Sequence, residues 1–208
     1  MKILNLYAGI GGNRKLWGQQ DITAIEIDPD IAKVYSDFYP GDKVIVGDAH
    51  EYLLNHYSEF DFIWASPPCP THSTISTGLK GWGIVRYPDM KLYQEIIFLK
   101  HFFDGLYVVE NVVSYYKPLI LPEKFCRHYF WANFNIKHTE IKDPTNGFVG
   151  QQKGTVGAYQ SALDINLSKV LIKNKRKLLR NCVNPELGKH IFDCAMGSIK
   201  NETQIELF

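Results

Sequence analysis

The feature that most constrains this chain is a regular alternation of short apolar runs with helix-like segments. The apolar runs span Ile3–Tyr7, Ile22–Ile27, Val44–Val46, Phe60–Ala65 and Leu106–Val109. Helical periodicity between them is clearest at Asp30–Phe38, Ala49–Tyr57 and Asp89–Phe103. Strands that alternate with helices indicate a parallel sheet with helices packed on it. We therefore expect an α/β fold with helices on both faces of the sheet.

Composition limits the classes to which the chain can belong. Its 208 residues are 45% hydrophobic, enough for one compact core. No apolar run approaches the roughly 20 residues of a membrane helix, and the polar N-terminus does not resemble a signal peptide. The cysteines Cys69, Cys126, Cys182 and Cys194 form no CxxC pair. This pattern favours a reducing, cytoplasmic location and argues against a metal site or a disulfide framework.

Charge gives a local indication of a nucleic-acid partner. The net charge is only +1, but Lys169–Arg180 contains six basic residues. Such a run can neutralise phosphates, or it can be an ordinary solvated helix face. The sequence leaves both interpretations open.

Three features at successive expected strand ends predict an adenosine pocket. The glycine turn Tyr7–Gly12 lies between a strand and an expected helix, where backbone can approach a ligand closely. Glu26 ends the second strand and could accept both ribose hydroxyls, and Asp48 ends the third and could accept an adenine amino group. Glu26 could instead be a solvated carboxylate, and Asp48 a helix cap. The turn is not GxGxxG, so S-adenosylmethionine fits better than NAD.

A cysteine and a second carboxylate follow the next two expected strands. Ser66-Pro67-Pro68 places Cys69 at the start of a polar loop, Pro70–Arg86, and Glu110 ends the fifth strand. Carbon 5 of cytosine becomes nucleophilic only when a nucleophile adds at carbon 6, and a proton donor at ring nitrogen 3 assists that addition. A thiolate and a carboxylic acid are the minimal pair for this chemistry. Glu110 should then be buried, with a raised pKa.

These motifs together resemble the DNA cytosine-5 methyltransferase family across nearly the whole chain. Asn5–Gly12 is similar to its first motif, Pro68-Cys69 to its Pro-Cys motif, and Glu110-Asn111-Val112 to its Glu-Asn-Val motif. The resemblance implies a Rossmann-like class I methyltransferase sheet, catalysis by Cys69 and Glu110, S-adenosylmethionine as cofactor and double-stranded DNA as substrate. It also implies a monomeric enzyme of a bacterium or an infected host cell, with a partner subunit as a second option.

The resemblance extends to further residues. Arg127 is similar to the arginine of the strand that touches the flipped cytosine, and Asn181 lies in a late motif that folds back toward the nucleophile loop. The implied cofactor contacts are Tyr7, Gly9, Gly11, Gly12, Glu26, Ile27, Asp48, Ala49, Pro67 and Asn181.

The chain also departs from the family pattern. Asn5 replaces the usual Asp, and Pro70 replaces the usual Gln after the Pro-Cys pair. The arginine strand has one arginine, with His128 beside it, where two are common. The target-recognition region is short. We expect a catalytic domain over 1–136, a small irregular recognition segment over 137–160 and a C-terminal segment over 161–208 that packs back. Few base contacts predict a target of about two to four base pairs.

Other functions remain open from the sequence. The same chemistry could act on a tRNA cytosine. An amino-group methyltransferase would use Ser66-Pro67-Pro68, but Cys69 stands where its aromatic residue belongs. A DNA-binding subunit that is inactive without a partner is the non-enzyme alternative.

Overall fold

The computed structural model describes residues 1–74, 83, 85–148 and 154–205. Within them, seven strands form one sheet in the order β3-β2-β1-β4-β5-β7-β6. The first five strands in this order are parallel, and β7 is antiparallel to both β5 and β6. The strand bounds are β1 Lys2–Leu6, β2 Asp21–Glu26, β3 Lys43–Val46, β4 Phe62–Ala65, β5 Leu106–Val112, β6 Glu123–Phe125 and β7 His128–Ala132.

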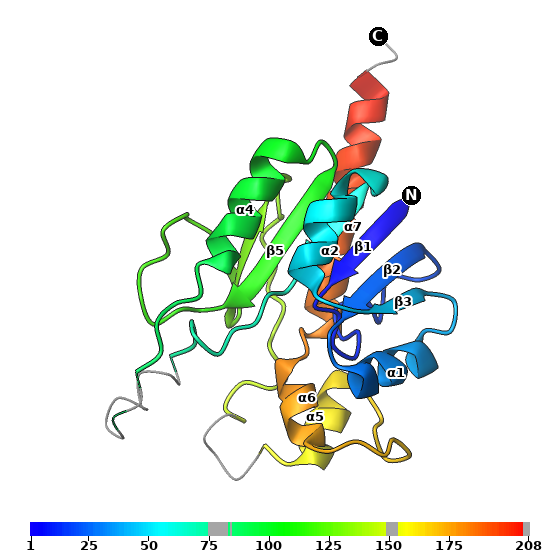
Figure 1. Ribbon diagram of the computed structural model, residues 1–208, viewed down its shortest axis with the longest axis vertical. Helices are drawn as coiled ribbons and strands as arrows, with labels where there is room; N and C mark the ends of the chain where they lie inside the picture. Colours follow the sequence, from blue (N-terminus) through cyan, green and yellow to red (C-terminus); the bar gives the residue numbers. More distant parts are fainter. Residues whose placement is uncertain (75–82, 84, 149–153, 206–208) are drawn as a thin grey trace.

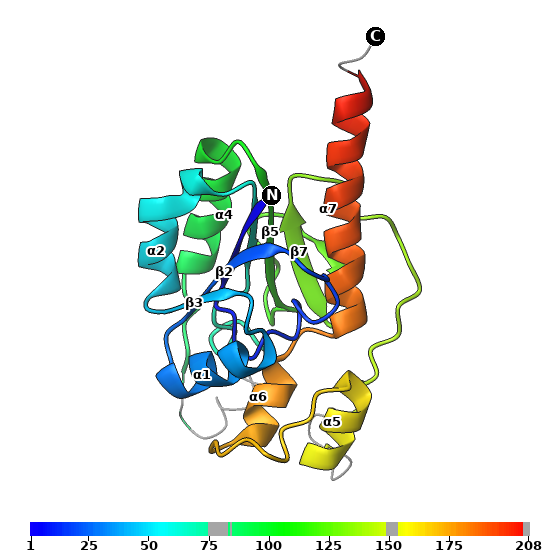
Figure 2. The ribbon, with the colours of Figure 1, turned by 90° about the vertical axis from the view of Figure 1, so that its right-hand side faces the viewer.

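The expected Rossmann-like methyltransferase sheet, with helices on both faces, is confirmed. Helices α2 and α4 lie on one side of the sheet and α7 on the other (Figure 2). The central strands point toward the end of the molecule where α5 and α6 lie (Figure 1). The helix bounds are α1 Pro29–Phe38, α2 Ala49–His56, α4 Lys91–Phe102, α5 Val156–Leu163, α6 Lys175–Asn181 and α7 Pro185–Ile205, with a short 3₁₀ turn at Tyr57–Glu59.

Alternate residues of the strands face two separate apolar cores. In β1, Leu4 and Leu6 pack toward α2 and α4, whereas Ile3 packs toward α7. On the α7 side, Trp17 stacks on Phe192 with ring centroids 4.9 Å apart. Because β1 is covered on both faces, its residues after Lys2 are almost completely buried. The sheet is therefore a rigid base for the loops at its carboxyl edge.

The helix expected directly after the glycine turn is absent from the described chain. Residues 12–17 instead form turns, in which Lys15 and Trp17 each donate to the carbonyl three residues earlier. Gly12 and Gly188 lie so close to their neighbours that added Cβ atoms would meet backbone within 3 Å. The C-terminal helix α7 covers the face that this helix would have covered. That prediction was wrong because a distant segment fills the space.

Strand β5 is longer than expected, so Glu110 and Asn111 lie within it. The apolar run ends at Val109, but β5 continues to Val112 because β7 pairs with it. Glu110 lies opposite Phe130, and Asn111 opposite Tyr129. The pairing holds both polar side chains on regular backbone instead of a loop.

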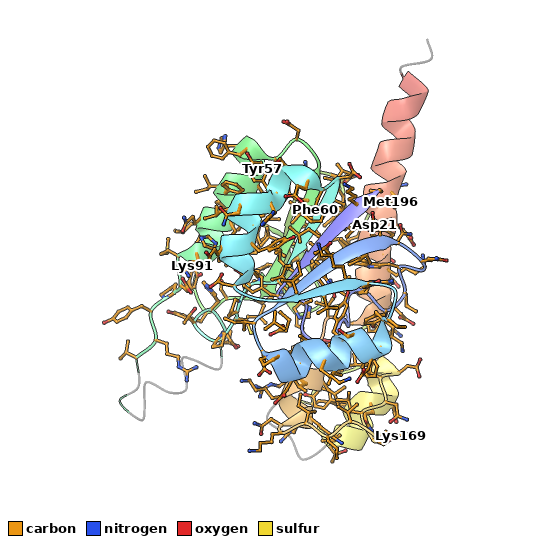
Figure 3. The ribbon with its side chains drawn as sticks, turned by 45° about the vertical axis from the view of Figure 1, so that its right-hand side comes forward. Asp21, Tyr57, Phe60, Lys91, Lys169 and Met196 are labelled. Atoms are coloured by element: carbon orange, nitrogen blue, oxygen red, sulfur yellow. The ribbon has the colours of Figure 1, made fainter. Side chains whose placement is uncertain are left out.

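The C-terminal third is more helical than its composition indicated. Helix α5 begins inside the expected recognition segment 137–160, of which residues 149–153 are outside the described part. The basic run Lys169–Arg180 divides into a connection and α6, with Lys169 beside α5 (Figure 3). Helix α7 begins at Pro185 and extends to Ile205. Nowhere in the described chain is a helix both long and apolar enough to cross a membrane.

Candidate active site

The glycine turn after β1 has a left-handed backbone conformation that residues other than glycine rarely adopt. Gly9 and Gly11 have φ angles of 55° and 76°, and Tyr7 also lies in the left-handed region with φ 57°. A bulky residue in that region costs on the order of 1–3 kcal/mol. A Cβ atom at Gly11 would lie 2.3 Å from the ring of Tyr39. The turn is therefore held in one shape by close packing from α1 and its C-cap.

Glu26 ends β2 and closes the turn. Its side chain accepts a hydrogen bond from the N–H of Gly9 through Oε2 at 2.9 Å and from the N–H of Asp28 through Oε1 at 3.0 Å. The residue is buried, with 9% of its surface exposed. Each carboxylate oxygen has two acceptor directions, so one on each oxygen is left for a ligand.

Asp48 is a helix cap and also lines a pocket. Its Oδ1 accepts hydrogen bonds from the backbone N–H groups of His50 and Glu51 at the start of α2. These bonds lower the pKa of the carboxyl below its ordinary value, so it is ionised near neutral pH. The cap interpretation is thus confirmed, and the same side chain lies on the wall of the pocket.

A pocket of about 160 Å³ lies beyond the ends of β1, β2 and β4. Six of the ten predicted cofactor residues line it, whereas Gly9, Gly11, Gly12 and Asn181 are not among the described lining residues. Sequence reasoning missed the wall that α4 contributes from its first turn, where Lys91 lies (Figure 3). The lining residues are Tyr7, Glu26, Ile27, Asp48, Ala49, His50, Pro67, Pro68, His72, Asp89, Lys91 and Leu92.

Cys69 lies partly buried in the turn that follows β4. Its carbonyl accepts hydrogen bonds from the N–H groups of His72 and Ser73, which fixes the start of the loop. Burial raises the pKa of the thiol, and the negative charge of Glu110 raises it further. The positive charges of Arg180 and Arg127 act in the opposite direction. Residues 75–82 and 84 of the expected loop Pro70–Arg86 are outside the described part.

The charge of Glu110 acts on the Cys69 thiol, and the Glu110 side chain is buried, as its predicted role requires. Only 6% of its surface is exposed, and burial raises the pKa of its carboxyl to about 7. His128 Nε2 lies 3.7 Å from Glu110 Oε1. Burial lowers the pKa of His128 to about 3, so this imidazole is neutral and does not form an ion pair with Glu110 at neutral pH.

Asn111 connects the two strands that carry these groups. Its side-chain N–H donates to the carbonyl of Pro67 at 2.9 Å, and both residues are buried. The bond joins β5 to the backbone two residues before Cys69. It gives the Glu110-Asn111 pair a physical reason to occur beside Pro67-Pro68-Cys69, which the sequence alone did not supply.

Arg127 lies in the two-residue turn between β6 and β7, not within a strand. Its Nε forms an ion pair with Asp143 Oδ2 at 2.9 Å, and its Nη2 donates to the carbonyl of Arg180 at 3.4 Å. Its charge is close enough to lower the pKa of both Glu110 and Cys69. The structure therefore brings Cys69, Glu110 and Arg127 together. Asp143 was not predicted, because nothing in its local sequence marks it.

Asn181, in contrast, lies exposed at the end of α6. The contact with the glycine turn is made by the next residue, Cys182, whose Cβ lies 2.8 Å from the position of a Cβ added to Gly12. The late motif thus reaches the turn, but through a neighbour of the predicted residue.

The family model of C-5 cytosine-specific DNA methylases matches residues 1–112, more than half of the chain. The chain belongs to the C-5 cytosine-specific DNA methylase family. The matched part includes Cys69 and Glu110 and ends at Val112, before Arg127 and Asn181. The chain is therefore a cytosine methyltransferase by family, and a comparison with curated proteins found no match.

Several solved structures are similar to this chain over different shares of its length. A methyltransferase of Entamoeba histolytica, EhMeth, covers 96% of this chain and 98% of its own at 11% identity, with a TM-score of 0.55. A DNMT2 variant of Spodoptera frugiperda covers 53% and 35% at 24% identity, with a TM-score of 0.36. A SAM-dependent methyltransferase of Agrobacterium tumefaciens covers 56% and 40% at 12% identity, with a TM-score of 0.41. EhMeth shows that the shared fold extends over nearly the whole chain.

Proposed function

We propose that this methylase transfers a methyl group from S-adenosylmethionine to carbon 5 of cytosine in double-stranded DNA, with Cys69 as nucleophile. The proposal is supported by the electrostatic effect of Glu110 and Arg127 on the Cys69 thiol, next to a pocket whose wall includes Glu26, Asp48 and Pro68, the residue before Cys69. The thiol and the buried acid are the pair that cytosine activation requires.

The pocket fits the adenosine part of the proposed cofactor. Glu26 has one acceptor direction left on each oxygen, which suits the two neighbouring hydroxyls of a ribose. Asp48 is an ionised acceptor for an amino group. Ile27, Pro67 and Leu92 supply apolar walls for a purine ring. When bound, S-adenosylmethionine would supply a methyl group made electrophilic by its positive sulfur.

The chain's own groups would then act on the cytosine. The Cys69 thiolate forms a bond from Sγ to carbon 6, and protonated Glu110 donates to ring nitrogen 3, so the charge does not build up on the ring. Carbon 5 would become nucleophilic and take the methyl group, and the electrons of the broken methyl–sulfur bond would stay on the sulfur of the leaving S-adenosylhomocysteine. The proton on carbon 5 would then pass to a base, the proton on ring nitrogen 3 would return to Glu110, and cleavage of the Sγ–carbon 6 bond would restore the aromatic ring and the thiolate. Arg127 is placed to donate to the cytosine carbonyl.

The protonation states of the two groups support each other. A negative Glu110 raises the pKa of the Cys69 thiol. When Glu110 carries its proton, which its pKa of about 7 allows at neutral pH, that opposing charge disappears. Arg127 and Arg180 then favour the thiolate unopposed by Glu110. Burial still raises the pKa of the thiol, so in the proposed mechanism the thiolate that the addition needs forms from a mainly protonated thiol beside a neutral acid.

The remaining regions suit DNA binding. We propose that 1–136 form the catalytic domain, that 137–160 contact the target bases, and that 161–208 pack back on the catalytic domain. Lys169, Lys173 and Arg176 are exposed on the α5–α6 connection and on α6, at the end toward which the strands point. Exposed cations at that edge can contact phosphates next to a flipped base.

Product analysis tests the proposal directly. The purified chain is incubated with labelled S-adenosylmethionine and, separately, with mixed duplex DNA and with tRNA, and the modified bases are identified. We expect 5-methylcytosine in DNA, and none with Cys69→Ser. Methylation of tRNA alone would favour the RNA alternative, and an amino-methylated base would favour the amino-group alternative. Absence of transfer to either nucleic acid would overturn the proposed activity of the chain by itself.

A further inference from the structure

A buried carboxylate that the proposed reaction does not use lies behind the pocket. Glu95, on α4, has no exposed surface. Its Oε1 accepts a hydrogen bond from the hydroxyl of Tyr7 and lies 2.9 Å from Nδ1 of His50. Its Oε2 has no hydrogen-bond partner within the described chain. A fully buried acid with two polar contacts on a single oxygen is costly unless it orders its neighbours.

With Glu95 as a carboxylate, this arrangement favours a proton on Nδ1 of His50. The Tyr7 hydroxyl has one proton, and it donates that proton to Oε1. An oxygen with two lone pairs can accept a second donor, so His50 donates through Nδ1–H. In a neutral imidazole the other nitrogen, Nε2, then has a lone pair and acts as an acceptor. His50 lines the pocket, and with Nδ1 committed to Glu95, Nε2 is the ring nitrogen left to face it.

The same part of the pocket holds a second acceptor. Asp48 and His50 lie two residues apart at the start of α2, and both line the pocket. Asp48 uses Oδ1 for the helix cap, which leaves Oδ2 for a ligand. Two acceptors side by side suit a group with two hydrogens, such as the exocyclic amino group of adenine. They repel the carbonyl oxygen that a deaminated purine has at that position.

We propose that His50, held in one tautomer by Glu95, determines specificity for an amino-purine in this pocket. The inference rests on the proposed use of an adenosine cofactor and adds a residue to it. His50 would read the amino group directly, and Glu95 is a positioning residue that acts through His50. Tyr7 occupies the other acceptor direction of Glu95 Oε1.

Calorimetry with two probes tests the inference. The probes are S-adenosylhomocysteine and S-inosylhomocysteine; in the second, a carbonyl oxygen replaces the amino group and ring nitrogen 1 carries a proton. We expect the wild-type chain to prefer the amino form, and His50→Phe to reduce that preference about tenfold while keeping a ring in place. The matched control is His56→Phe, on the same helix, because His56 pairs with Glu59 at the surface and does not line the pocket.

Two substitutions of Glu95 separate positioning from packing. Glu95→Gln keeps an acceptor oxygen for Tyr7 and His50 and should retain the preference. Glu95→Met has similar volume without an acceptor, so His50 can turn and the preference should fall. Equal preference in these two variants, or an unchanged preference in folded His50→Phe, would overturn the inference. Binding of neither probe by the wild-type chain would instead overturn the proposed cofactor, and with it this inference.

Discussion

Asp48 and Glu110 are both acids at the carboxyl edge of one sheet, yet their surroundings give them opposite properties. Asp48 is exposed and accepts two backbone N–H groups at the start of α2, which lower its pKa. Glu110 is buried between β4 and β7, and burial raises its pKa to about 7. The first is therefore a permanent acceptor, and the second is an acid that can give up a proton near neutral pH.

The difference shows that the role of a carboxylate depends on the element that carries it. A helix N-terminus offers free N–H groups that stabilise the charged form. The middle of a buried strand offers few, because its N–H groups are used by neighbouring strands. The proposed cofactor-binding and cytosine-binding halves of the site thus differ in the elements that carry their acids.

The largest expected effect is on the rate of methyl transfer. Glu110→Gln keeps the shape of the side chain but removes the acid, so we expect the rate to fall by about 100- to 10,000-fold. Cofactor affinity should remain unchanged, because Glu110 does not line the pocket. The control is Glu123→Gln at the exposed start of β6. A loss of less than threefold in single-turnover assays would remove Glu110 from the mechanism.

The pH dependence of stability should differ between the two acids. The pKa of Glu110 is raised by folding, so its contribution is complete below pH 4.5 and is lost as pH rises through about 7. The pKa of Asp48 is lowered, so its contribution is lost as pH falls through that lowered pKa. Glu110→Gln should therefore gain on the order of 3 kcal/mol relative to wild type between pH 4.5 and 8.

Denaturant titrations of wild type and Glu110→Gln over this pH range would measure the difference. The comparison between variants is needed because His128 titrates in the opposite direction in both, its pKa being lowered to about 3. A constant difference between the two chains at every pH would contradict the buried environment of Glu110.

Cofactor affinity should respond to the acids of the other half. Glu26→Ala and Asp48→Ala should each weaken binding by roughly 1.5–3 kcal/mol, about ten- to a hundredfold. Asp48→Asn sharpens the test, because Asn caps a helix as well as Asp does but lacks the charge. Asp28→Asn is the matched control, since Asp28 caps α1 and does not line the pocket. Affinities of both Glu26→Ala and Asp48→Ala equal to that of wild type would place the cofactor elsewhere.

The smallest expected effect concerns the basic run. Charge reversal at the exposed Lys173 and Arg176 should weaken DNA binding and reduce the salt dependence of log Kd by about 0.9 for each lost phosphate contact. The bases that are methylated should stay the same, because phosphate contacts carry no sequence information. Reversal at Lys43 and Lys100 serves as control. An unchanged salt slope would show that the run is only a solvated surface.

Much of the parallel part of the fold could be predicted from the sequence, because apolar runs and strand-end residues are local signals. The five parallel strands and the helices between them were found within a few residues. The extension of β5 to Val112 was missed because it depends on β7, which lies later in the chain. The helix predicted after Gly12 does not form because α7 takes its place, with Gly188 packed against that segment.

The site shows the same limit. Glu26, Asp48 and Cys69 follow local strand ends, and the structure places them at one edge of the sheet. The contact between His50, which lines the pocket, and Glu95 behind it depends on how α2 and α4 face each other, which no local pattern describes. The ion pair of Arg127 with Asp143 joins residues from a hairpin and an irregular segment. Contacts of this kind arise only from tertiary packing.

The most direct test of the central claim is a covalent trap. A duplex that contains 5-fluorocytosine at the target should form a stable adduct with the chain in the presence of S-adenosylmethionine, because fluorine cannot leave as the proton does. Cys69→Ser should form none, whereas Cys126→Ser, at the other partly buried cysteine, should form it as wild type does. An adduct of undiminished yield in Cys69→Ser would contradict the account.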